Sequence, residues 1–156
     1  MNPTTNRREL LKHSAVVAGL LASAGLLPQL AHAEAISQAA FGAKGMDELY
    51  KALGIGKPVE SPLVTLTGPD IAENGAVVPL AVASTAPGVK RLLVLVEKNP
   101  NILTATFDVT EFVEPQMSTR VKMGQTSNVY ALAITNDNKV LFAQKEIKVT
   151  LGGCGG

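Results

Sequence analysis

Short strand-forming segments that follow one another without an intervening helix constrain the fold of this chain most strongly. Between residues 63 and 151, runs rich in Val, Ile, Leu and Thr alternate with turns rich in Gly, Pro and Asn. Strands about 8–12 residues apart predict a mainly β fold, an antiparallel sandwich, rather than a parallel sheet with crossover helices. The expected strands are Leu63–Thr67, Ala76–Ala83, Arg91–Val96, Ile102–Val109, Gln116–Met123, Val129–Thr135 and Val140–Leu151.

Three local signals refine this pattern. Asn136-Asp137-Asn138 predicts a tight hairpin between the last two strands, because Asn and Asp suit the backbone of short turns. Pro79 lies inside an expected strand and has no N–H to donate, so it predicts a sheet edge or a bulge there. Apolar and polar residues alternate up to Leu151, so the last strand leads directly into Gly152.

A helical segment is expected before the strands, over residues 34–56. Apolar residues recur at spacings of three and four from Ala35 to Leu53, which predicts one helix. Gly42 and Gly45 weaken this helix, and a break between its halves is expected. The run Gly54–Pro58 ends it, and the sandwich domain then covers residues 57–151.

The first 33 residues resemble an export signal. A basic start is followed by the apolar run Ala15–Leu27, and Ala31-His32-Ala33 is a small-x-small cleavage site after Ala33. This apolar run is too short for a transmembrane helix, which needs about 20 residues. The pair Arg7 and Arg8 resembles the twin-arginine pattern, although an arginine pair also occurs in general secretory signals. We therefore expect a periplasmic protein without a membrane anchor.

The composition of the expected mature part excludes several function classes. Both histidines, His13 and His32, lie in the signal, so Glu34–Gly156 contains no His and a single Cys. This rules out Ser-His and Cys-His catalysis and the ordinary zinc, copper and haem sites. Oxygen-only metal sites remain possible, but no calcium-loop pattern occurs, so we expect no cofactor. With 11 Lys and Arg against 12 Asp and Glu, neither nucleic acid nor a membrane surface is an expected partner.

The single cysteine lies in the sequence Gly152-Gly153-Cys154-Gly155-Gly156. Glycine has no Cβ, so four glycines restrict neither the backbone nor the space around the sulfur. Five extended residues reach roughly 17 Å, about the depth of an enzyme cleft. No cation or helix start nearby in the sequence activates the thiol, so no catalytic residue is expected. The pattern favours a flexible arm, residues 152–156, that presents Cys154 as a passive attachment point.

Other readings of this ending stay open. A disulfide from Cys154 to a second subunit would make the chain a tethered, non-enzymatic binding subunit. A terminal Gly-Gly also resembles ubiquitin-like sulfur carriers, which load sulfur on the last carboxylate, but Cys154 would then have no role. The cysteine could also be incidental in a frayed terminus. Prenylation is excluded, because only two residues follow the cysteine.

Taken together, these residues resemble the SoxY family, the sulfur-carrier subunits of bacterial thiosulfate oxidation. The resemblance covers nearly the whole chain and is most specific at the glycine-rich ending. It includes the twin-arginine-like signal, Ile71-Ala72-Glu73-Asn74-Gly75 leading to Val78-Pro79-Leu80, Ser118-Thr119-Arg120-Val121-Lys122-Met123-Gly124, and Gly152–Gly156.

The resemblance implies an immunoglobulin-like sandwich that forms a heterodimer with a second all-β subunit, SoxZ. It also implies that Cys154 carries sulfur and thiosulfonate intermediates covalently. The implied partner enzymes are a c-type haem enzyme that loads thiosulfate, a manganese hydrolase that releases sulfate and, in some organisms, a molybdenum–haem enzyme. The sequence does not indicate which face meets the second subunit, although Gln116, Met117 and residues 118–127 are candidates.

Overall fold

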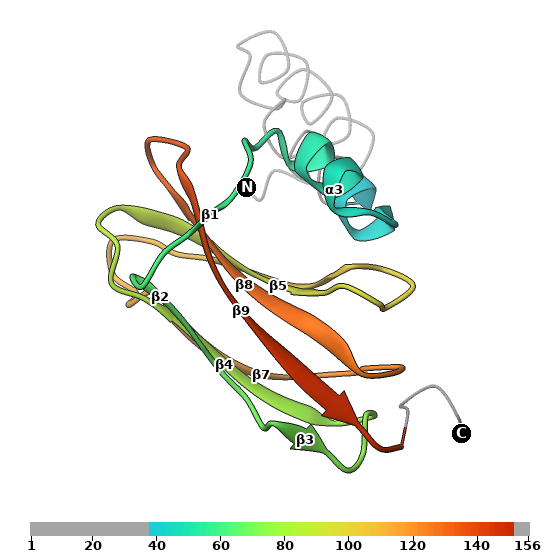
Figure 1. The fold of residues 1–156 in the computed structure, drawn as a ribbon. Coiled ribbons are helices and arrows are strands. Elements are labelled where there is room, and N and C mark those ends of the chain that lie inside the picture. Colours follow the sequence, from blue (N-terminus) through green and yellow to red (C-terminus); the bar gives the residue numbers. More distant parts are fainter. Residues whose placement is uncertain (1–37, 152–156) are drawn as a thin grey trace, which may run out of the picture. The chain divides into compact units, whose positions relative to one another are not determined.

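Two sheets build the part of the chain that the computed structural model describes, residues 38–151 (Figure 1). The larger sheet has the strand order β1-β9-β8-β5-β6, with β3 also paired to β9, and the smaller sheet has the order β2-β4-β7. The predicted antiparallel, immunoglobulin-like sandwich is thus confirmed. The strands are β1 (Val59–Glu60), β2 (Val64–Thr67), β3 (Ile71–Ala72), β4 (Val78–Ser84), β5 (Val89–Val96), β6 (Leu103–Asp108), β7 (Gln116–Val121), β8 (Ser127–Thr135) and β9 (Val140–Val149).

The centre of the larger sheet, in β5 and the second half of β8, is buried on both faces. Alternate side chains of β5, such as Leu92 and Val94, point to one face and pack into the core between the two sheets. The side chains between them, Leu93 and Leu95, point to the opposite face and pack into a second core beneath the helical segment. Figure 1 shows α3 (Met46–Leu53) on the face of the larger sheet that points away from β4 and β7. Because neither face of β5 meets water from Leu92 to Val96, this part of the strand is continuously apolar instead of alternating.

The helical segment is divided as expected. Residues 38–42 are helical, the chain is irregular at residues 43–45, and α3 begins at Met46. Gly54 ends α3 in the left-handed conformation, with φ 63°, which glycine adopts without a steric penalty. Leu49 is fully buried against the larger sheet. Residues 34–37 of the expected segment lie outside the described residues. Between residues 38 and 151, no helix combines the length and apolarity needed to cross a membrane.

Every predicted strand is present, with ends that shift by up to two residues. Pro79 pairs with Arg120 of β7, but β2 ends opposite Ala81, so Pro79 has a neighbouring strand on one side only. The expected local edge at Pro79 is therefore confirmed. The two-residue strands β1 and β3 were not predicted, because two residues are too few for a periodic pattern.

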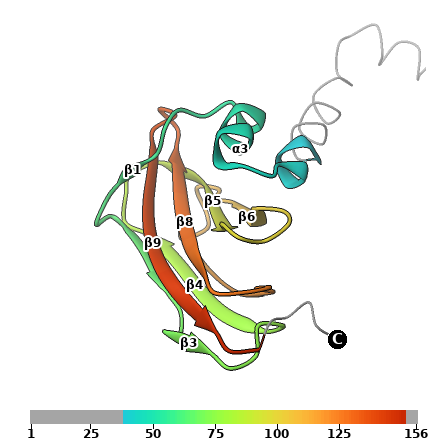
Figure 2. The same cartoon turned by 45° about the vertical axis from the view of Figure 1, so that its right-hand side comes forward.

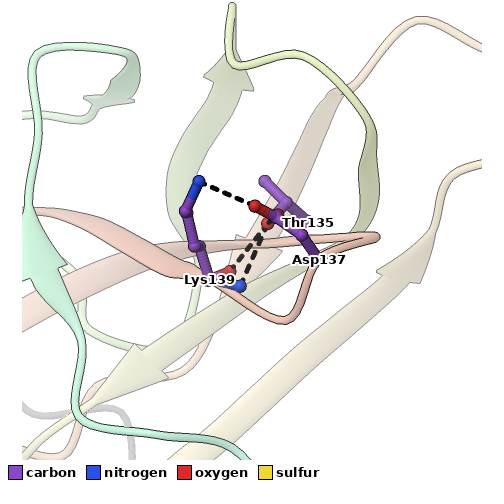
Figure 3. Close-up of polar contacts among 3 residues, drawn as sticks. All are labelled: Thr135, Asp137 and Lys139. Carbon is purple, nitrogen blue, oxygen red and sulfur yellow. Dashed lines mark hydrogen bonds and ion pairs between the residues drawn. The ribbon is translucent and has the colours of Figure 1, made fainter.

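The predicted hairpin between β8 and β9 is stabilised by a polar cluster of three side chains (Figure 3). Lys139 Nζ contacts Asp137 Oδ2 at 2.7 Å, and the Lys139 amide donates to Thr135 Oγ1 at 3.1 Å. The hydrogen bond from Lys139 and the one from Thr135 lower the pKa of Asp137 to about 2. Asn138 has φ 60°, as a residue in such a tight turn requires.

The outer edge of β9 is covered by parallel pairing at both of its ends. Val59 and Glu60 of β1 pair with Leu141 and Phe142, and β3 pairs with Lys148 and Val149. Between them, Lys145 Nζ donates to the carbonyl oxygen of Gly68 at 2.6 Å. Figure 2 shows β3 beside the end of β9, close to where the described chain stops. The strand that leads to the cysteine is thus enclosed along this edge.

Candidate functional site

The predicted attachment site lies just past the last described residue. Cys154 and the arm glycines Gly152, Gly153, Gly155 and Gly156 lie outside the described residues, as do Arg7, Arg8 and Ala33 of the expected signal. The structure does describe the base of the arm, which is the end of β9 and the segments that bind it. This base fixes the point in the fold at which the glycine-rich ending begins.

Hydrogen bonds donated by main-chain amides hold both edges of β9 as it ends. On one edge, the Lys148 amide donates to Asp70 O at 3.0 Å and the Thr150 amide donates to Ala72 O at 3.1 Å. On the other edge, the Val149 amide donates to Thr126 Oγ1 at 3.0 Å. Successive amides of a strand point in opposite directions, and here each of the three has an acceptor.

Gly75 links the end of β9 to a second segment. Its amide donates to the carbonyl oxygen of Leu151 at 2.7 Å, and its own carbonyl accepts a hydrogen bond of 2.7 Å from the Met123 amide. Gly75 is buried, so these bonds are shielded from water. The two internal stretches singled out in the sequence, residues 71–75 and 118–124, therefore meet at the base of the arm.

A salt bridge holds the segment that precedes β3. Lys145 Nζ lies 2.9 Å from Asp70 Oδ1 and also binds Gly68 O, so one ammonium group ties the turn at residues 68–70 to β9. The hydrogen bond from Lys145 lowers the pKa of the Asp70 carboxyl group. The Asp70 carboxylate therefore stays ionised at neutral pH, and its contact with Lys145 supports the covered edge of β9.

The surface around this base is mixed in character. Leu151, Ile71 and Val77 are exposed apolar side chains, with exposed fractions of 64%, 56% and 54%. Lys148 and Glu73 are exposed charged residues in the same segments. Among residues 38–151, no group of three or more His, Cys, Asp or Glu side chains is placed to hold a metal ion.

A shallow depression of about 470 Å³ lies on the outer face of the smaller sheet. Pro79 and Ala81 contribute to it from β4, and Ser118 and Arg120 from β7. Arg120 is the only side chain among these four that carries a charge, and it is exposed. No nucleophile with a neighbouring base lies there, so this depression has no catalytic constellation among the described residues.

Sequence reasoning missed two features of the structure, one at the base of the arm and one at the opposite end of the strands. The bond between Gly75 and Leu151 joins positions far apart in sequence, and no motif marks such a pair. Phe112, which is 89% exposed in the loop between β6 and β7, was also not singled out. A lone aromatic residue between Glu111 and Glu114 was the available signal for an exposed loop.

Comparisons with known proteins give a consistent result. The family model described as "Sulfur oxidation protein SoxY" matches residues 50–154, a span that includes Cys154. The solved structure of the sulfur carrier protein SoxY from Chlorobium limicola f thiosulfatophilum is 32% identical in sequence, with a TM-score of 0.60. The match covers 67% of this chain and 94% of that one. No curated protein matches the chain.

More distant structures share only the fold. A superoxide reductase (neelaredoxin) from Ignicoccus hospitalis has a TM-score of 0.50 at 16% identity, and the match covers 55% of this chain and 78% of that one. A putative superoxide reductase from Thermotoga maritima has a TM-score of 0.50 at 12% identity, covering 59% of this chain and 93% of that one. At such identities the likeness concerns the sandwich architecture and no activity.

Proposed function

This chain belongs to the SoxY family of sulfur oxidation proteins, and on that premise we propose that it is a carrier whose Cys154 holds sulfur intermediates covalently. The carrier presents these intermediates to separate enzymes and is itself no enzyme. We propose the periplasm as its location, reached through the twin-arginine-type signal of residues 1–33 with cleavage after Ala33.

The observation that carries this proposal is the anchored base of the arm. Gly75 binds the carbonyl of Leu151, and Cys154 is only three residues further along the chain. Three extended residues span about 10 Å, so the sulfur stays within that distance of a fixed point while glycines leave its approach direction free. An anchored origin with a short, unhindered arm supports delivery of one thiol to several active sites.

The proposed chemistry assigns no activating group of this chain to the sulfur. In loading, the Cys154 thiolate and thiosulfate form a sulfur–sulfur bond, and two electrons leave to a c-type haem partner enzyme. In release, water attacks the terminal sulfonate at a manganese hydrolase, giving sulfate, two protons and a persulfide on Cys154. A molybdenum–haem enzyme is the proposed oxidant of the remaining sulfane sulfur. Each metal belongs to a partner, and the carrier contributes the thiol and the arm.

We also propose that the chain forms a heterodimer with a SoxZ-like all-β subunit. Family membership supports partners from the same sulfur-oxidation system. The twin-arginine route exports proteins that are already folded. No cofactor motif in the sequence explains the use of this route, but binding to a second chain before export would explain it.

Mass spectrometry of the protein isolated from cells grown on thiosulfate tests the carrier role. We expect a sulfur or thiosulfonate adduct on Cys154, and none on the Cys154→Ser variant. A protein-sized adduct that disappears on reduction would instead indicate the alternative, a binding subunit tethered by an intersubunit disulfide. Full thiosulfate oxidation with Cys154→Ser would end the carrier proposal.

A further inference from the structure

The two lateral sides of the sandwich are closed to different degrees. On one side, β1, β3 and Lys145 cover the outer edge of β9. On the other side, β6 and β7 are the last strands of their sheets, and within residues 38–151 no strand pairs with their outer edges. Since β2 packs over β8 and β9 and β4 packs over β5, the strands β6 and β7 lie on the same side. Unpaired edge strands are templates for another strand.

The main chain of β7 directs hydrogen-bonding groups outward. The Ser84 amide donates to Pro115 O at 2.9 Å. Every second residue of β4, counted from Ser84, therefore directs its main-chain N–H and C=O groups toward β7. Their partners in β7 include Thr119, which pairs with Leu80. In an antiparallel ladder the alternate residues point the other way, so Ser118 and Arg120 direct their N–H and C=O groups to the open edge.

The β6 edge is less suited to receive a strand. The Val109 amide donates to Lys90 O at 2.9 Å, so Thr106 and Asp108 are the residues whose main-chain groups point outward. However, the ladder between β5 and β6 contains a register shift, and charged Asp108 lies at its end, ion-paired with Arg91. Irregularity and charge are common protections of sheet edges. The ladder between β4 and β7 is regular over all of its six pairs.

An exposed aromatic side chain lies beside the start of the β7 edge. Phe112 is 89% exposed and Val113 is 43% exposed, in the loop that joins β6 to β7. The Val113 amide donates to Thr110 O at 3.1 Å, which shapes this loop as a turn. Glu111 and Glu114 are exposed on either side of the two apolar residues. An aromatic residue flanked by carboxylates suits an apolar pocket with a basic rim.

We propose that this open side, the outer edge of β7 together with Phe112, receives a second all-β subunit. One edge strand of that subunit pairs with Ser118 and Arg120, and Phe112 fills an apolar pocket in it. The inference rests on the proposed function and names the surface that the second subunit covers. Phe112 and Leu151 lie at opposite ends of the strands, because β6 ends where β9 begins. The proposed surface therefore begins at the end of the sandwich far from the base of the arm, and its Arg120 end approaches that base through Met123 and Gly75.

Amide hydrogen exchange tests the surface directly in the unmodified protein. The full mature chain is measured alone and in complex with the SoxZ-like subunit of the same organism, produced together. We expect the amides of Ser118 and Arg120 to exchange at least about 100-fold more slowly in the complex, while those of Thr106 and Asp108 stay unchanged. A complex in which Ser118 and Arg120 exchange as fast as in the isolated chain would overturn the inference and leave the heterodimer intact.

Matched variants provide a second measurement. Ser118→Pro removes an outward N–H and no bond to β4, and we expect the dissociation constant of the complex to rise at least about tenfold. Thr106→Pro makes the same change on the β6 edge and should leave the constant within about twofold. Phe112→Ser should also weaken binding about tenfold, whereas Val59→Ser, at an exposed position on the covered side, should not. Equal effects within either pair would contradict the proposal.

Two further outcomes separate this inference from the proposed function. If the wild-type chain forms no complex with the SoxZ-like subunit, the proposed heterodimer fails and this inference fails with it. If the isolated chain instead forms a homodimer that protects Ser118 and Arg120, the edge is used by a second copy, and the proposed occupant is wrong.

Discussion

The amide of Gly75 donates a 2.7 Å hydrogen bond to the carbonyl oxygen of Leu151, the residue directly before the glycine-rich ending. Because Gly75 also accepts a hydrogen bond from Met123, it connects the end of β9 to the segment that follows β7. The origin of the arm is thus tied to both sheets of the sandwich. On the proposed function, this fixed origin lets the thiol of Cys154 change position while the strands stay in place.

The first prediction concerns where mobility begins. Ordering one residue costs about 1–2 kcal/mol of backbone entropy, and glycine lies at the expensive end of this range. The bonded residues Ile147–Leu151 should therefore be rigid on the fast timescale, whereas Gly152–Gly156 should not. Backbone amide order parameters measured by NMR relaxation should fall sharply after Leu151. Equally high values on both sides of this boundary would contradict a flexible arm.

The second prediction concerns the support of β9 by Thr126. The Val149 amide donates to Thr126 Oγ1, so Thr126→Val keeps the shape of the side chain and leaves a half-buried N–H unpaired. We expect the free energy of unfolding to fall by about 1–2 kcal/mol, measured by urea denaturation. The control is Thr150→Val, which removes an exposed hydroxyl bound to Glu73 O and should change stability by less than about 0.5 kcal/mol. Similar losses for both variants would show that the Thr126 bond has no special role.

The third prediction concerns the glycines beside the cysteine. Gly153→Val or Gly155→Val adds a branched side chain next to the sulfur and removes backbone conformations. Partner enzymes should load the variants more slowly, while a small alkylating reagent should react with Cys154 at nearly the wild-type rate. Parallel slowing of both reactions would mean that the glycines affect the thiol itself rather than its access to an enzyme cleft.

The fourth prediction concerns the pH dependence of the hairpin. The pKa of Asp137 is about 2 in the folded chain, against an ordinary value of 3.8. Because the folded value is the lower one, the contribution of Asp137 is complete at neutral pH and is lost as the pH falls from about 4 to 2. NMR titration of the side-chain carboxyl should give a midpoint near 2, and Lys139→Ala should raise it. A midpoint of 3.8 in the wild-type chain would show that the cluster does not persist in solution.

The fifth prediction concerns export. The twin-arginine route exports folded proteins, and this domain has no cofactor motif that would require folding before export. Export together with a bound partner would explain the use of this route. The mature protein, purified from the periplasm under mild conditions, should therefore run as a complex with a chain that lacks its own signal. Size-exclusion chromatography with mass analysis of the peak checks this. A purely monomeric protein would contradict co-export.

Local chemistry explains why most elements were predictable. Gly54 ends α3 because its left-handed backbone suits glycine, and Asn136–Asn138 form the hairpin because Asn and Asp suit short turns. The apolar run Leu92–Val96 was correctly predicted to lie in a strand, but the sequence did not indicate that one face of this strand packs under a helix. Only packing distinguishes those two surroundings, since both favour the same side chains.

The sequence by itself determined where the main strands and turns lie along the chain, and it placed the single thiol on a glycine-rich ending. These features depend on neighbouring residues alone. Only the tertiary structure decided which segments meet. The pairing of β3 with β9, the bond from Gly75 to Leu151 and the open edge of β7 each join or separate residues that are far apart along the chain. Main-chain groups make these contacts, and they are chemically alike at every residue, so no side-chain pattern records their partners.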